Sequence, residues 1–420
     1  MNISEKILAA SSGRDEVKPN DIVEARVEMA MVNEMTGPLA IQTFEKIGTE
    51  KVWDRQRIVL VQDHQVPADT VKSAELHKIM RAFAKEQAIP LLYDIGSGGV
   101  CHQVMVEKGH VRPGELVVGA DSHSCMYGAL GAFATGIGST EMASVFATGK
   151  LWLRVPSSIR INIAGAFQKF VTPKDLILRI VGQVGADGAI YKSIEFTGPA
   201  INKIPVSGRL TMCNMTVEMG AKTGIIQPDR TTLDYIRDHA SGPFKVVRSD
   251  EDATYEETME FNIDNLEPQV ACPHSVDNVK PAKDIQGVEI DQAFIGSCTN
   301  GRPEDLELAA EMLKGRRIKE GVRLLVTPAS QEVYLEALKR GLLEVFVNAG
   351  AYVCNPTCGA CFGGHMGLLA AGEVCISSSN RNFQGRMGSP ESDVYLASPA
   401  TVAASALAGE IVDPRHFMGA

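Results

Sequence analysis

The sequence lacks any run of roughly 18 or more apolar residues, so we expect no membrane-spanning helix. It also lacks a basic block: 41 Lys and Arg stand against 51 Asp and Glu, and a net charge of −10 argues against nucleic-acid or anionic-membrane partners. The N-terminus has no apolar signal core, which predicts a cytoplasmic protein. Nine cysteines in 420 residues are too few for a disulfide scaffold. We therefore expect the cysteines to be buried thiols or ligands of a metal or cluster.

What the chain has instead is a repeated plan of an apolar strand, a polar loop and a helix start. Five segments follow this plan: 57–70, 115–146, 291–313, 323–346 and 373–388. Continuous apolar runs that alternate with helical patterns predict α/β architecture with buried parallel strands. Since ligands of such folds bind beyond the carboxyl ends of the strands, the loops after these strands are candidate sites.

We expect three α/β domains, at residues 1–156, 157–280 and 281–420. A strand at 157–167 would open the second domain after the break at Pro156. The segment 249–260 carries six acidic residues in twelve positions and is predicted to be a solvated face or loop, and the proline-punctuated stretch 266–285 is predicted to be a connection. The glycine-rich segment 135–141 lacks the lysine and spacing of a phosphate loop, so we interpret it as a tight loop that starts a helix.

Two sets of cysteines compete as cluster ligands. Cys354, Cys358 and Cys361 have the spacing of radical SAM enzymes, but only 59 residues (420 − 361) follow them, too few for the barrel those enzymes need. The other set joins Cys298 to Cys358 and Cys361. Cys298 lies between an apolar strand and a helix start at Pro303, a place that favours the thiolate. We prefer this set, with Cys354 structural.

The number of ligands decides the chemistry of the cluster. Three thiolates leave one iron of a [4Fe–4S] cluster open to oxygen ligands as a Lewis acid, whereas a fourth would make an electron carrier, which remains an alternative. The other five cysteines are expected to be buried small residues: Cys101, Cys125, Cys213, Cys272 and Cys375.

Three histidines lie next to an aspartate or a glycine-rich turn in the sequence. Asp63-His64 ends one strand, His102 follows a glycine-rich turn, and Asp121 precedes His123 by two residues at the end of another strand. A carboxylate beside a histidine orients the ring and raises its basicity, which suits proton transfer. A single such histidine is more often a core residue, but three within 59 positions (123 − 64) indicate a catalytic site.

Two further groups are candidates for acid–base work and substrate binding. Asn214 and Glu218 are four residues apart and would share a helix face, and the apolar neighbours of Glu218 would favour an acid–base role, although a capping or surface role explains it equally well. Asn380, Arg381 and Arg386 share a loop after a strand. Two guanidinium groups suit a di- or tricarboxylate, and solvated loop arginines are the alternative.

Together these motifs resemble the aconitase family, and within it the shorter, archaeal-like branch of 3-isopropylmalate dehydratase large subunits. The resemblance is carried by VQDHQVPA, GVCHQV, GADSHSCMYGALGAFATGIGSTEMA, NMTVEMGA, IGSCTNGR, NPTCGACFGG and SSNRNFQGR. It implies three α/β domains around a central cleft, with a [4Fe–4S] cluster held by Cys298, Cys358 and Cys361. It implies the catalytic residues Asp63, His64, His102, Asp121, His123 and Glu218. It implies the substrate-binding residues Ser122, Asn214, Asn380, Arg381 and Arg386.

Two departures from aconitases proper bear on activity. Pro38 stands where those enzymes carry a substrate-contacting glutamine, which argues against citrate. The chain also ends at Ala420, after the third domain, without the swivelling domain that carries a serine base. The resemblance therefore implies a separate small subunit, a swivel-domain protein.

The expected activity is that of a hydro-lyase acting on a small di- or tricarboxylate hydroxy acid. We expect it to interconvert 2-isopropylmalate and 3-isopropylmalate in leucine biosynthesis, with homoaconitate and 2,3-dimethylmalate chemistry as alternatives. An RNA-binding form without the cluster, known among aconitase relatives, is disfavoured by the negative charge.

Overall fold

The computed structural model describes residues 1–240 and 242–417. Contacts group the chain into two compact units, one of residues 1–164 with 189–261 and the other of residues 165–188 with 262–420. The four-stranded sheet that follows residue 157 falls in the same unit as the N-terminal sheet. The three-domain division at residues 156 and 280 stays a prediction.

A five-stranded parallel sheet forms the centre of the first unit. Its order is β4-β3-β2-β5-β6. The strands are β2 (Met29–Asn33), β3 (Ile58–Val61), β4 (Leu92–Tyr93), β5 (Leu116–Gly119) and β6 (Phe133–Gly136). β2, β3 and β5 are buried at every position, because helices cover the sheet, and this explains their continuous apolar runs.

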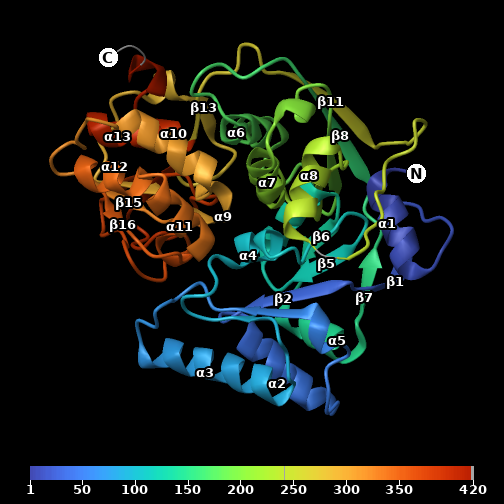
Figure 1. The fold of residues 1–420 in the computed structure, drawn as a ribbon. Helices are drawn as coiled ribbons and strands as arrows, with labels where there is room; N and C mark the ends of the chain where they lie inside the picture. The colour runs from blue at the N-terminus through green and yellow to red at the C-terminus, as the bar shows by residue number, and fades with distance from the viewer. Residues whose placement is uncertain (241, 418–420) are drawn as a thin grey trace. The chain divides into compact units, whose positions relative to one another are not determined.

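Helices α2 (Gly37–Ile47), α3 (Val71–Glu86) and α5 (Ser139–Thr148) pack together beside this sheet (Figure 1). Alternate strand residues such as Ala30 and Val32 share a core with three rings of these helices, Phe44, Phe83 and Phe146. The ring centroids lie 5.7–6.3 Å apart. Helix α4 (Cys101–Glu107) and the 3₁₀ segment η2 (Ser122–Leu130) also contact the sheet. The core thereby fixes the strands whose ends carry the candidate histidines.

The remainder of the first unit contains two smaller sheets. A two-stranded ribbon pairs β1 (Ile22–Arg26) with β7 (Lys150–Arg154), and a four-stranded sheet has the order β10-β9-β8-β11. Its strands are β8 (Ser158–Ala164), β9 (Ser193–Thr197), β10 (Thr223–Ile226) and β11 (Glu257–Asn262). The helices are α1 (Ile3–Ser12), α7 (Val206–Asn214) and α8 (Arg230–His239), and the 3₁₀ segments are η1 (Arg55–Arg57), η3 (Ile201–Lys203) and η4 (Met215–Met219).

The second unit is built on a seven-stranded mixed sheet of order β13-β12-β18-β17-β14-β15-β16. Its strands are β12 (Gln269–Ala271), β13 (Val279–Pro281), β14 (Gln292–Ile295), β15 (Arg323–Val326), β16 (Tyr352–Val353), β17 (Val374–Ser377) and β18 (Asp393–Leu396). Figure 1 shows its helices α6 (Pro173–Val184), α9 (Ser297–Asn300), α10 (Pro303–Leu313), α11 (Gln331–Lys339), α12 (Leu342–Ala349) and α13 (Pro399–Ala408). Its 3₁₀ segments are η5 (Ala282–Ile285), η6 (Gly359–Phe362) and η7 (Pro414–Phe417).

The α/β prediction is confirmed, and the strands of all five segments with the repeated plan form, as β3, β5, β14, β15 and β17. The strand expected at 157–167 forms as β8. The glycine-rich segment 135–141 contains the end of β6, a tight loop at residues 137–138 and the start of α5, so the expected tight loop that starts a helix is confirmed. The prediction of a connection at 266–285 was wrong in part, because β12 and β13 lie within it. The acidic segment 249–260, expected to be a solvated face or loop, runs into β11. β11 is an edge strand with mostly exposed side chains, which explains why its acidic residues resemble a loop.

Candidate active site

Two of the three candidate histidines, His64 and His123, follow the carboxyl ends of parallel strands, and the third, His102, lies on α4. β3 ends at Val61 and leads into Asp63-His64, and β5 ends at Gly119 and leads into Asp121. Both strands pair in parallel with the central strand β2 between them, so their ends meet at one edge of the sheet. β2 itself ends at Asn33 and is followed by Glu34, which is fully buried.

Glu34 holds the Asp63-His64 turn in place. Its carboxylate accepts hydrogen bonds from the main-chain N–H groups of Asp63, His64 and Gln65, at 2.9, 2.7 and 2.8 Å. Nε2 of His77 lies 3.7 Å from the same carboxylate. Burial opposes ionisation of Glu34, but His77, the charge of His64 and the N–H donors lower the Glu34 pKa to about 2.

His64 is buried and lies against the buried carboxylate of Asp63. Its Nδ1 lies 2.6 Å from Asp63 Oδ1, and Asp63 also accepts a hydrogen bond from the Cys101 N–H at 2.7 Å. Burial alone would lower the His64 pKa, but the carboxylates of Asp63 and Glu34 together raise it to about 10. The ring therefore carries a proton at neutral pH.

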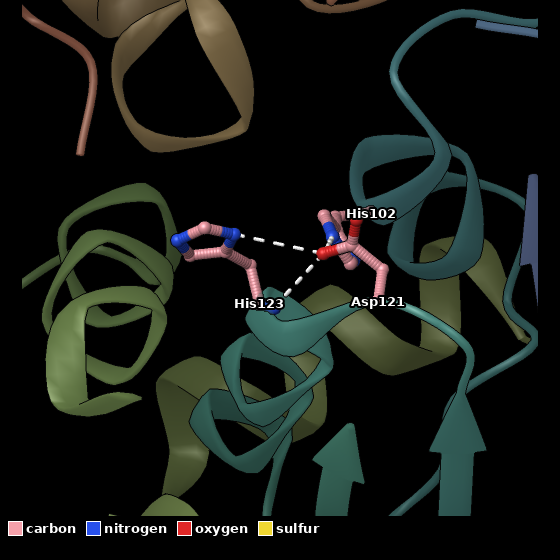
Figure 2. A group of neighbouring side chains, drawn as sticks. All are labelled: His102, Asp121 and His123. Atoms are coloured by element: carbon pink, nitrogen blue, oxygen red, sulfur yellow. Dashed lines mark hydrogen bonds and ion pairs between the residues drawn. The ribbon is translucent and has the colours of Figure 1, made fainter. Parts of the chain in front are cut away.

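A second histidine–carboxylate group is centred on Asp121 (Figure 2). Asp121 Oδ1 lies 2.8 Å from His102 Nε2 and accepts the main-chain N–H of His123 at 2.9 Å. His123 Nδ1 lies 3.5 Å from the same oxygen. Burial opposes ionisation, but the two histidines hold the Asp121 pKa well below its usual range. His102 Nδ1 lies 2.8 Å from the Tyr127 hydroxyl, which fixes the second nitrogen of the ring.

Glu218 extends this group, since its Oε1 lies 2.9 Å from His123 Nε2. Asn214 is completely buried, and its amide contacts the Met126 sulfur at 3.5 Å. Both side chains therefore reach η2, although they do not share one α-helix as expected. Helix α7 ends at Asn214 and the 3₁₀ segment η4 continues to Glu218. Ser122 is the first residue of η2 and is half-buried.

In the second unit the candidate cysteines also follow strand ends. Cys298 lies on α9 directly after β14, and Cys358 precedes η6, which contains Cys361. All three are buried, and the Cys361 N–H donates to the Cys358 carbonyl at 3.0 Å. Cys354 follows β16 and its N–H bonds to Val326. Burial raises the pKa of the Cys354 thiol.

Asn380 connects two of these cysteines. Its Nδ2 donates toward Cys298 Sγ at 3.5 Å, and Cys361 Sγ lies 3.9 Å from its Oδ1. Arg386 Nη2 lies 4.0 Å from Cys361 Sγ. Arg381 is half-buried next to Asn380. The structure thus brings Asn380 and Arg386, which were both expected as substrate-binding residues, to the cysteines.

Comparison with known proteins places these features in one family. The family model described as aconitase family (aconitate hydratase) matches residues 5–284 and 275–409, which is most of the chain. The chain belongs to the aconitase family. This membership confirms the family resemblance that was drawn from the sequence motifs. It also implies an iron–sulfur cluster.

Relatives within the aconitase family align from end to end. A probable 3-isopropylmalate dehydratase large subunit of Methanothermobacter thermautotrophicus is 56% identical over 414 residues, 99% of each chain. A 3-isopropylmalate dehydratase large subunit of Methanopyrus kandleri is 56% identical over 416 residues, again 99% of each. A probable methanogen homoaconitase large subunit of M. thermautotrophicus is 55% identical over 423 residues, 100% of this chain and 99% of the relative.

The residues present fit the cluster that the aconitase family implies. Buried cysteine sulfur is the donor that iron–sulfur clusters require, and two of the three candidates, Cys298 and Cys361, meet at the amide of Asn380. Arg302 donates to the Cys298 carbonyl and, at 2.8 Å, to that of Thr299, which fixes the turn that presents Cys298.

Sequence reasoning missed Glu34, Tyr127 and Arg302. Glu34 follows an apolar run, 29–33, that was not recognised as a strand, and a charged residue directly after such a run was the available signal. Tyr127 and Arg302 lie inside the quoted motifs but act through contacts that are not visible in spacing. Among the described residues, we found no helix long and apolar enough to cross a membrane.

Proposed function

We propose that this chain is the large subunit of a hydro-lyase that interconverts 2-isopropylmalate and 3-isopropylmalate in leucine biosynthesis. The observation that carries the reaction class is the pair of histidine–carboxylate groups at one edge of the first sheet, Asp63 with His64 and Asp121 with His102 and His123. The substrate is supported by end-to-end relatives that are named 3-isopropylmalate dehydratase large subunits.

In this proposal His64 is the general acid that protonates the leaving hydroxyl group. Asp63 binds Nδ1, so the ring delivers its proton from Nε2. With a pKa of about 10 the ring is protonated at neutral pH, and Glu34 keeps the turn rigid through three N–H bonds. A positioned acid of this kind typically accelerates a reaction by about 10²–10⁴-fold.

The group around Asp121 holds its two histidine rings in fixed orientations and relays protons. Its carboxylate stays ionised and holds His102 through Nε2, while Glu218 holds His123 through Nε2. Tyr127 occupies the remaining nitrogen of His102, so the ring cannot turn without losing two contacts. We assign hydrogen bonding to the substrate to Ser122, next to this group, and to the buried amide of Asn214.

We assign the [4Fe–4S] cluster to Cys298, Cys358 and Cys361. When bound, the cluster supplies one iron without a protein ligand, a Lewis acid for hydroxyl and carboxylate oxygens. Arg381 and Arg386 bind a substrate carboxylate, because guanidinium matches it in a bidentate manner. Asn380 holds Cys298 and Cys361 through its amide.

We further propose that a small subunit supplies the base that removes the proton from the neighbouring carbon. Support comes from the names of the relatives, which align over 99% of their own length and are called large subunits. Homoaconitase is the second candidate, because a relative named as its large subunit is almost equally similar, at 55% identity.

The test is reconstitution with two different small subunits. The cluster-loaded chain is combined anaerobically with the small subunit of either Methanothermobacter enzyme, and turnover of 3-isopropylmalate and of homocitrate is measured. We expect turnover of 3-isopropylmalate with the dehydratase small subunit and about 10²–10⁴-fold less from the chain alone, because a positioned base is missing.

The control is the Cys298→Ala chain with the same small subunit, which should be inactive. Turnover of homocitrate alone, with either partner, would favour the homoaconitase assignment. Absence of turnover with both substrates, at full iron content, would contradict a hydro-lyase.

A further inference from the structure

A completely buried lysine lies behind the candidate cluster residues of the second unit. Lys174 is the second residue of α6, its exposed fraction is 0%, and its Nζ donates to the carbonyls of Ser378 and Ser379 at 2.9 and 2.5 Å. None of the steps assigned above uses it.

This position is unfavourable for an ammonium group on two grounds. Burial removes it from water, and the first turn of a helix carries a partial positive charge that repels cations. Burial lowers the pKa of Lys174 to about 7, and neighbouring thiol and carboxyl groups, chiefly Cys361 and Asp305, limit that fall. Negative charge at the cysteines and at Asp305 therefore favours the ammonium form of Lys174.

The carbonyls that Lys174 binds belong to the segment that presents Asn380. Ser378 and Ser379 lead directly from β17 to Asn380, whose amide contacts the sulfur atoms of Cys298 and Cys361. The same segment is fixed by Ser378 Oγ, which accepts the Gly296 N–H at 3.0 Å beside Cys298. Lys174 thus holds the segment whose Asn380 contacts both Cys298 and Cys361.

We propose that Lys174 is a positioning residue for the iron–sulfur cluster: its buried charge offsets the negative charge of the cluster and its thiolates, and its two hydrogen bonds hold Asn380 against them. This inference rests on the proposed cluster site. A [4Fe–4S] cluster held by three thiolates has a net negative charge, and net charge and hydrogen bonds to the sulfurs set cluster potentials. Removing the cation should make the cluster harder to reduce and easier to oxidise.

The experiment measures the cluster rather than turnover. Lys174→Met removes the charge and both hydrogen bonds, whereas Lys174→Gln removes the charge but keeps a donor. Midpoint potentials come from redox titration followed by EPR in the anaerobically loaded chain, and cluster lifetime in air is followed by its visible absorbance.

The matched control is Arg209→Met in the first unit. Arg209 is also 0% exposed and donates to two carbonyls, those of Ile201 and Ile204, at 3.0 and 2.9 Å. We expect both Lys174 variants to have a more negative potential than the wild type and to lose the cluster several-fold faster in air. Arg209→Met should lower thermal stability without shifting the potential.

Wild-type potential and lifetime in both Lys174 variants would overturn the proposal. Loss of cooperative thermal unfolding in both would also overturn it, because Lys174 would then be a folding residue. Failure to load iron in variants that still unfold cooperatively supports it, because the charge is then needed to hold the cluster. A wrong substrate assignment leaves these measurements unaffected, and a wild-type chain without a cluster would contradict the proposed function itself.

Discussion

Replacing Cys298, Cys358 or Cys361 with alanine should each leave the chain unable to hold a four-iron cluster, whereas Cys354→Ala should load normally. The first three are buried at the ends of β14 and around η6, and Asn380 bridges the sulfurs of Cys298 and Cys361. Removing one of three thiolates leaves two irons without a protein ligand, and the cluster should dissociate. Cys354 has a pKa raised by burial and an N–H paired with β15, and we expect its role to be structural.

Iron and sulfide content of anaerobically purified variants, with visible absorbance, measures this effect. Cys375→Ala is the matched control, because Cys375 is completely buried on β17 and burial raises its pKa to about 12. Full loading of Cys298→Ala together with loss of the cluster in Cys354→Ala would instead assign the ligands to Cys354, Cys358 and Cys361.

His64→Gln should reduce turnover of the reconstituted enzyme by about 10²–10⁴-fold, because it removes the positioned acid. The same change should alter the pH dependence of stability in the chain alone. The His64 pKa is raised from 6.5 to about 10, so the stabilisation is fully present below pH 6.5 and is lost as the pH rises through 10. Glu34→Gln should lower the His64 pKa, because the charge of Glu34 helps to raise it.

Denaturant unfolding between pH 6 and pH 10 measures this dependence. The free energy of unfolding should fall with pH in the wild type and fall less in His64→Gln. His239→Gln, at an exposed histidine of α8, is the control and should keep the wild-type slope. An unchanged slope in His64→Gln, with wild-type turnover, would show that His64 is a core residue.

The sequence predicted those parts of the site that depend on strand ends and short motifs. Apolar runs at 58–61, 116–119 and 374–377 indicated buried parallel strands, and parallel strands bring their carboxyl ends to one edge. Asp63, Asp121 and Asn380 could therefore be expected near their sheet edges without coordinates.

The sequence could not predict contacts between residues far apart in the chain. Glu34 binds the turn at Asp63 from 29 residues away, and Lys174 binds Ser378 across 204 residues. A single sequence has no motif or residue spacing that would predict either of these contacts. The units are also discontinuous, since residues 165–188 leave the first unit and join the second, and no composition shift marks either crossing.

The measurement that tests the central claim most directly is EPR during controlled exposure of the loaded chain to air. The account predicts that one iron, the one without a protein ligand, leaves first and that a three-iron signal appears. Adding Fe²⁺ and a reductant should remove that signal in step with the return of activity in the reconstituted enzyme. A cluster that survives air with activity unchanged, or that breaks down without a three-iron stage, would contradict the open iron.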